Sequence, residues 1–190
     1  MKEEFIELLK SVKRNGIENL ISYLEKTDFF TAPASTRFHG NYEGGLLEHS
    51  LNVYHCLRQK LSQKPFCDVL SVSNETIILI SLLHDLCKTN YYVVDYRNKK
   101  NEQGVWVKEP YYTVNDTIPY GHGEKSVMML SKFIDLSMDE IYAIRWHMGF
   151  SEPKELQNTV STVFEKYPLV LALHESDMEA TFLLESKSKK

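Results

Sequence analysis

Hydrophobic residues recur at helical spacing along most of the chain. Apolar residues three and four positions apart predict helices over 2–14, 16–26, 46–63, 121–135, 138–148, 155–165 and 168–185. A further helix is expected to begin near Asn74 and to stay apolar as far as Leu83. Pro, Gly and Asn residues interrupt the pattern between 27 and 45, which predicts a loop there. The pattern predicts an all-α fold.

The hydrophobic pattern changes after Lys88. Two stretches, 91–96 and 105–114, are rich in β-branched and aromatic residues, and 98–104 between them has the composition of a turn. We therefore predict a small β-hairpin inserted at about 90–115. Its aromatic residues are Tyr91, Tyr92, Tyr96, Trp106, Tyr111 and Tyr112. They form either a lid whose rings stack on a base or, the interpretation we favour, a surface that packs the insert on the domain.

Composition indicates an ordinary globular protein. A chain of 190 residues, 43% of them hydrophobic and 25% charged, can bury a core without staples. A net charge of -4 argues against a general nucleic-acid coat protein, which would be basic. Three cysteines without a C-x-x-C pair indicate reduced thiols. With no signal-peptide pattern and no apolar run near the ~18 residues of a membrane span, we expect a cytoplasmic protein that does not enter a membrane.

The predicted apolar helix after Asn74 leads into His84 and Asp85. Burying an imidazole and a carboxylate costs several kcal/mol or more unless both are paired, and a divalent metal ion would pair both. If the helix continues, Lys88 lies on the same face, where its ammonium suits an anionic substrate such as a phosphate. The alternative is a buried His and Asp at a helix end, where a lysine is simply favourable. These residues alone do not decide between the two.

Six of the seven histidines lie in apolar or glycine-rich surroundings, and His55 is the exception. The six are His39, His49, His84, His122, His147 and His174. A single histidine of this kind is more often a core or capping residue than a ligand. Metal sites between helices nevertheless draw inward-pointing ligands from separate elements in this way.

The order of these residues resembles the HD-domain superfamily of metal-dependent phosphohydrolases, whose extended signature is H…HD…H…H…D. The matching positions are His49, His84, Asp85, His122, His147 and Asp177. The stretch 43–50 is similar to the HD domain of a bacterial 3′–5′ exoribonuclease, and 83–88 is similar to the common L-H-D-x-G-K. Other stretches resemble stand-alone HD proteins of bacteria and phages. Cys87 replaces the usual glycine and is expected to touch no ligand.

The resemblance implies the fold and the cofactor. It implies a single HD domain over 1–190, with N-terminal helices in 1–35 and an HD core in 36–182, built as a helical bundle. It also implies one or two divalent transition-metal ions. The first would be bound by His49, His84, Asp85 and Asp177, and the second would share Asp85 and take His122 and His147. Four imidazoles favour Mn, Fe, Co, Ni or Zn over Ca or Mg.

The resemblance also implies a reaction. A metal-activated hydroxide would cleave a phosphomonoester or phosphodiester of a nucleotide or other phosphorylated small molecule, with a nucleic-acid end as a further option. Asp85 and Lys88 would be catalytic, and Lys88, Arg37 and His39 would contact the substrate, although His39 could equally be a loop-packing residue. His174 would support the site through a hydrogen bond. Alternatives are a di-iron oxygenase, since one branch of the superfamily uses the same six ligands, and a non-catalytic nucleotide sensor.

Overall fold

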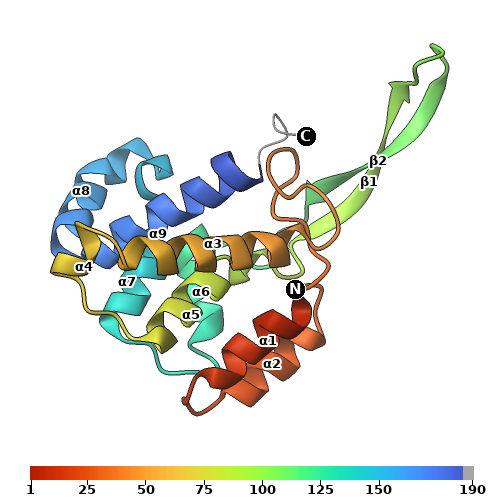
Figure 1. The fold of residues 1–190 in the computed structure, drawn as a ribbon. Coiled ribbons are helices and arrows are strands. Elements are labelled where there is room, and N and C mark those ends of the chain that lie inside the picture. Colours follow the sequence, from red (N-terminus) through yellow and green to blue (C-terminus); the bar gives the residue numbers. More distant parts are fainter. Residues whose placement is uncertain (186–190) are drawn as a thin grey trace.

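The computed structural model describes residues 1–185. It is mostly helical with one two-stranded hairpin, as the hydrophobic pattern predicts (Figure 1). The helices are α1 Lys2–Ser11, α2 Ile17–Glu25, α3 Gly45–Leu61, α4 Phe66–Val69, α5 Asn74–Leu83, α6 His122–Leu130, α7 Met138–Trp146, α8 Gln157–Lys166 and α9 Pro168–Glu179. Short 3-10 turns cover Leu86–Lys88, Gly149–Ser151 and Lys154–Leu156, and a π-helical turn covers Ala180–Leu184.

Helix α5 lies at the centre of the core. Every residue from Ile77 to Leu83 is buried, because α1, α3 and α7 all pack against this helix. Its start is fixed by Ser73, whose hydroxyl accepts a hydrogen bond from the backbone N–H of Thr76. Helix α3 crosses the middle of the molecule and packs against both α5 and α9 (Figure 1). Four of the six candidate ligands, His49, His84, Asp85 and Asp177, lie on these helices or directly after one of them.

The N-terminal helices α1 and α2 pack side by side at one end of the bundle (Figure 1). An ion pair joins this end to α7. The guanidinium of Arg14 donates to both carboxylate oxygens of Glu140, at 2.7 and 2.6 Å. Glu140 is fully buried and also completes a capping box with Ser137 at the start of α7. The predicted N-terminal helices therefore contribute to the same hydrophobic core as the remaining helices.

Several helices end before the predicted boundary. The predicted helix 2–14 ends at Ser11, where Val12 is extended, and the predicted helix 121–135 ends at Leu130. The predicted helix 168–185 is α-helical only to Glu179, after which the chain makes the π-helical turn. The short helix α4 was not predicted, because four residues are too few to show a period.

No helix within residues 1–185 is long and apolar enough to cross a membrane.

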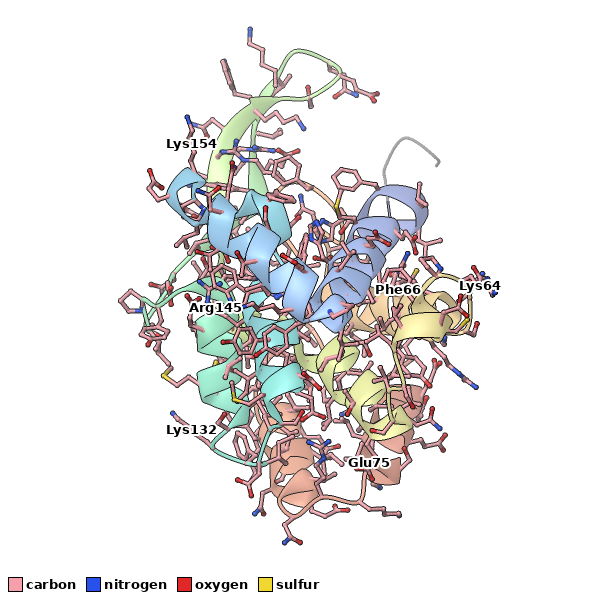
Figure 2. All side chains as sticks on the ribbon, turned by 90° about the vertical axis from the view of Figure 1, so that its left-hand side faces the viewer. Lys64, Phe66, Glu75, Lys132, Arg145 and Lys154 are labelled. Carbon is pink, nitrogen blue, oxygen red and sulfur yellow. The ribbon has the colours of Figure 1, made fainter. Side chains whose placement is uncertain are left out.

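The hairpin consists of β1 Tyr92–Lys100 and β2 Trp106–Val114, paired antiparallel from Tyr92↔Val114 to Lys100↔Trp106. The predicted turn began at Asn98, but Asn98–Lys100 continue the strand, and the turn lies between Asn101 and Val105. Both views show the hairpin extending as an arm beyond the helices (Figures 1 and 2).

Our favoured interpretation of the hairpin aromatics is wrong for its outer half. Tyr96 is 61% exposed and Trp106 is 65% exposed, so neither packs on the domain. The rings at the base are partly buried, and the hydroxyl of Tyr92 donates to the backbone oxygen of Ala34 at 3.2 Å. The arm extends away from the helices, so only its base has a surface to pack against.

Candidate metal centre

Six side chains converge from five places in the fold. His49 lies in α3, His84 and Asp85 follow the end of α5, His122 is the first residue of α6, His147 follows α7, and Asp177 lies in α9. These are the six residues of the ordered motif. His49, His84, Asp85 and His147 are buried, and His122 and Asp177 are partly exposed.

Asp85 is the common neighbour of the four imidazoles. The Nε2 atoms of His122 and His147 lie 2.7 and 3.7 Å from its Oδ1. Those of His84 and His49 lie 3.5 and 3.8 Å from its Oδ2. Asp177 closes the far side, with its Oδ1 3.2 Å from His49 Nε2. All four rings therefore turn the same nitrogen toward one carboxylate.

The other nitrogen of two of these rings fixes the tautomer. His84 Nδ1 lies 2.8 Å from the backbone oxygen of Ser81, and His147 Nδ1 lies 2.7 Å from that of Ile144. A carbonyl oxygen only accepts, so Nδ1 carries the proton in both rings and Nε2 presents a lone pair to the centre. His84 Nε2 is buried and has no hydrogen-bond partner among the described residues. A metal ion would satisfy this nitrogen, and the donor set fits one.

Local sequence explains how the rings come together. In His84 and His147 the ring donates to the carbonyl three residues earlier, which is available because each helix has just ended. Gly123 allows α6 to lie against α7, since a Cβ there would be only 2.2 Å from the backbone oxygen of Arg145. The rings of His122 and His147 are consequently 5.2 Å apart.

The electrostatics divide the imidazoles into two kinds. Burial opposes the charged form of His49 and His122, but hydrogen bonds to carboxylates outweigh it and raise the pKa of each to about 10. Burial lowers the pKa of His147 to about 3, and it also lowers the pKa of His84. Burial alone would raise the pKa of Asp85, but Lys88 and His84 hold it well below its usual range. The carboxylate stays ionised and available as a ligand.

The possible ligand atoms fall into overlapping groups within 4.8 Å of one another. One group is His49, His84 and Asp85, a second is His84, His147 and Asp177, and a third is Asp85, Cys87 and His122. The first group agrees with part of the predicted first metal site. The second pairs His147 with Asp177, which the resemblance assigned to different ions. These groups could hold metal ions, and the division into two sites stays a prediction.

Helix α5 does not continue to Lys88, although the lysine still lies beside Asp85 as predicted. Helix α5 ends at Leu83, Asp85 leaves helical geometry at φ -101° and ψ 21°, and a 3-10 turn follows. This turn still brings the ammonium of Lys88 to 2.6 Å from Asp85 Oδ2. Although burial disfavours the ammonium, Asp85 raises the pKa of Lys88. Lys88 is thus a charged group at the centre.

A cavity of about 370 Å³ opens onto these residues. Asp85, Lys88, His122, His147 and Asp177 line it. Its remaining walls are Ala34, Ser35, Thr36, His39, Tyr91, Tyr92, Val114, Met148, Ser151, His174, Met178, Thr181 and Phe182. The cavity therefore joins the candidate ligands to a mixed polar and apolar surface that a small molecule could occupy.

The two loop residues predicted to contact the substrate lie in different places. His39 lines the cavity, and its ring centroid is 4.8 Å from that of His49. Both its ring nitrogens are buried without a hydrogen-bond partner among the described residues. Arg37 lies outside the cavity, in a groove of about 820 Å³ along the hairpin. Thr36 and Val114 line both spaces, so the groove adjoins the cavity.

Three other residues contact the candidate ligands from outside the six-residue motif. His174 donates from Nδ1 to the backbone oxygen of His147 at 2.7 Å, a supporting position as expected. The expectation that Cys87 touches no ligand is wrong, because its Sγ lies 3.3 Å from His122 Nδ1. Glu185 was missed, although its carboxylate lies 3.1 Å from His49 Nδ1. The sequence places it beyond the motif with no pattern to mark it.

A larger groove of about 740 Å³ lies over α6, α7 and α8 and contains none of the candidate ligands. Arg145, labelled in Figure 2, lines it. Arg145 makes salt bridges with Glu124 at 2.5 Å and Glu152 at 2.6 Å. The size of this groove does not make it the functional site, because the buried imidazoles and carboxylates lie elsewhere.

Comparison with known proteins gives one informative match. A curated protein from Methanocaldococcus jannaschii, dihydroneopterin 2′,3′-cyclic phosphate phosphodiesterase, is 35% identical over 101 residues, which are 49% of this chain and 36% of that protein. The match thus spans little more than a third of the relative's length. No family model matches the chain, and no solved structure matches it. Membership of the HD superfamily therefore stays a prediction. The relative's name, a phosphodiesterase, is consistent with that prediction.

Proposed function

We propose that the protein is a metal-dependent phosphohydrolase of the HD type, with one HD domain over 1–190, that cleaves a phosphodiester or phosphomonoester of a small nucleotide-like molecule. The observation that carries this proposal is the convergence of four Nε2 atoms on Asp85 beside the ammonium of Lys88. Imidazole and carboxylate ligands suit Mn, Fe, Co, Ni or Zn. When bound, such ions activate water and neutralise charge on a phosphate.

In this proposal the chain's own residues hold the ions and orient the phosphate. Asp85 lies between the imidazole pairs and would hold the ions together with them. Lys88 adds a mobile ammonium, which suits an anion whose charge shifts during reaction. His39, whose buried nitrogens have no partner among the described residues, contacts the bound substrate within the cavity.

The cavity supports a small substrate. A volume of about 370 Å³ is at the lower end of the range for ligand pockets. Tyr91, Tyr92 and Phe182 give it aromatic walls suited to a flat ring. The named substrate of the relative, a cyclic phosphate of a pterin, contains both a phosphodiester and such a ring. We therefore place cyclic phosphodiesters first among the candidate substrates.

Arg37 has a place in this proposal outside the cavity. It lies in the adjoining hairpin groove together with Arg97, and Arg97 is paired with Glu109 at 2.8 Å. A substrate longer than the cavity, such as a nucleic-acid end, would pass Thr36 and Val114 to reach Arg37. Replacing Arg37 by alanine should therefore weaken binding of an oligonucleotide and leave binding of a cyclic mononucleotide unchanged.

The test combines metal analysis with a substrate panel. The protein is purified without added metal, its metal content is measured, and it is assayed with 2′,3′-cyclic mononucleotides, cyclic dinucleotides, mononucleotides and short oligonucleotides. We expect bound transition metal and chelator-sensitive release of a phosphomonoester or phosphate. Bound iron with oxygen consumption and no hydrolysis would replace this proposal with the oxygenase. A protein that binds no transition metal would overturn it.

A further inference from the structure

A buried carboxylate lies behind His49, on the side of the ring away from the candidate ligands. The side chain of Glu185 is 1% exposed, and its two oxygens lie 3.2 and 3.1 Å from His49 Nδ1. The amide of Asn52, in the same helix as His49, donates to Glu185 Oε1 at 2.9 Å. A carboxylate this well buried needs such partners to stay charged. The proposed ligand set gives Glu185 no role.

The π-helical turn at the end of α9 accounts for this position. An α-helix turns by about 100° per residue, so a regular helix would carry residue 185 about 80° around the axis from Asp177. The wider turn Ala180–Leu184, closed by a hydrogen bond from Glu185 N–H to Ala180 O at 3.0 Å, takes up part of that rotation. Asp177 and Glu185 thereby both reach His49, one at each ring nitrogen.

The two ring nitrogens of His49 have different tasks. Nε2 faces Asp177 at 3.2 Å and Asp85 at 3.8 Å, on the metal side. If Nδ1 donates its proton to Glu185, Nε2 is left with a lone pair directed at the centre. His84 and His147 reach the same state by donating to backbone carbonyls. Among these three rings, His49 is the one oriented by a side chain, so its support can be removed by substitution.

We propose that Glu185 is a positioning residue for the metal site: it holds the His49 ring with Nε2 toward the metal and makes that nitrogen a stronger donor. The inference rests on the proposed metal site. Carboxylates that accept from a ligating histidine fix its tautomer and raise its basicity, and losing one typically costs 10- to 100-fold in metal affinity. We expect that loss for Glu185→Ala. Glu185→Gln, which keeps the shape and one acceptor oxygen, should lie at or below the lower end of that range.

The test measures Co²⁺ binding, because Co²⁺ reports its coordination through visible absorption. Full-length wild type, Glu185→Ala and Glu185→Gln are stripped of metal and titrated with Co²⁺ against a competing chelator. Glu179→Gln is the matched control, since Glu179 ends α9 and accepts from Lys60 at 2.7 Å, away from the centre. The free energy of unfolding of each metal-free protein is measured in parallel. We expect weaker Co²⁺ binding by the Glu185 variants and an affinity within about twofold of wild type for Glu179→Gln.

The possible results distinguish a positioning role for Glu185 from a structural role and from a role as a metal ligand. If the Glu185 variants lose stability but bind Co²⁺ as wild type does, Glu185 is structural and the proposal is overturned. His39, His49 and Glu185 also lie close enough to hold an ion themselves. Loss of a whole equivalent of Co²⁺ with unchanged affinity for the rest would make Glu185 a ligand and likewise overturn positioning. If Glu185→Ala does not fold, Glu185→Gln decides. Weakened Co²⁺ binding in a protein that cleaves no phosphoester would support the positioning role while refuting the proposed function.

Discussion

The ammonium of Lys88 lies 2.6 Å from Oδ2 of Asp85, and both side chains are largely buried. The pair explains why the carboxylate remains ionised at the end of an apolar helix, since Lys88 is the largest influence that lowers the pKa of Asp85 against the effect of burial. The same pair places a positive charge beside the proposed ligands. Two predictions, one for each residue of the pair, distinguish the role of Asp85 from that of Lys88.

The first prediction concerns Asp85. We expect Asp85→Asn to lower the affinity for transition metal by more than about 100-fold, because the substitution removes the negative charge at the point where the four imidazoles meet. His55→Ala is the control, since His55 lies on the exposed side of α3 and pairs with Glu4 at 3.2 Å. Metal content after dialysis against a chelator is the measurement. Equal losses in both variants would refute the ligand assignment.

The second prediction concerns Lys88. Lys88→Met retains the length and apolar stem of the side chain, so the fold should survive. We expect metal affinity equal to or slightly above that of wild type. The rate of phosphoester hydrolysis should fall by about 100-fold or more, because ~2–4 kcal/mol of transition-state stabilisation is lost. Steady-state kinetics with metal-saturated enzyme provide the measurement. A wild-type rate would show that Lys88 serves only to balance the charge of Asp85.

The sequence predicted the core of this arrangement because its signals are local or ordered. The apolar run from Ile77 to Leu83 marks a buried helix, and the order of the six motif residues marks candidate ligands that the structure does bring together. The contact of Cys87 with His122 was missed, since it depends on the 3-10 turn that follows α5. Glu185 reaches His49 through a π-helical turn, which has no sequence period. The β-branched and aromatic residues of the hairpin predicted its strands. Their identity does not show whether the domain offers a surface for them to pack against, so the exposure of Tyr96 and Trp106 was not predicted.

The third prediction concerns Gly123. An alanine Cβ at this position would lie 2.2 Å from the backbone oxygen of Arg145, so α6 and α7 would have to separate. We expect Gly123→Ala to lower the free energy of unfolding by about 1–3 kcal/mol and to weaken metal binding, because His122 is the adjacent residue. Gly104→Ala, at the hairpin turn, strains the backbone at φ +77° but meets nothing within 4 Å. If it weakens metal binding as much as Gly123→Ala does, the packing argument fails.

The fourth prediction concerns pH. Without metal, hydrogen bonds to carboxylates raise the pKa of His49 and His122 to about 10 despite burial. A histidine whose pKa rises on folding contributes stability below its unfolded pKa of about 6.5, and this is lost as pH rises through the folded value. We therefore expect the metal-free protein to lose stability between about pH 7 and pH 10. The lowered pKa values of Asp85 and Asp177 do not change the free energy of unfolding in this pH range, because the stability that these carboxylates contribute is lost only in acid.

Urea unfolding across this pH range, with chelator or with saturating Co²⁺, tests the prediction. Metal displaces the proton from each ligating nitrogen, so the metal-loaded protein should not show the alkaline loss. Parallel pH profiles for the two forms would mean that the ion does not bind these histidines.

The hairpin gives the molecule a second, separate level of stability. Its strands pair mainly with each other. Within residues 1–185 the contacts that hold its base to the body include the hydrogen bond from Tyr92 to Ala34 and the Lys125 ammonium 5.0 Å from the Tyr91 ring. Two-stranded ribbons are marginally stable in water, and breaking this one does not require α5 or its neighbours to open. In hydrogen–deuterium exchange the arm's amides should therefore exchange at a lower free energy than those of α5. We therefore expect the arm to be a foldon that melts and re-forms beside the cavity while the six motif residues stay assembled.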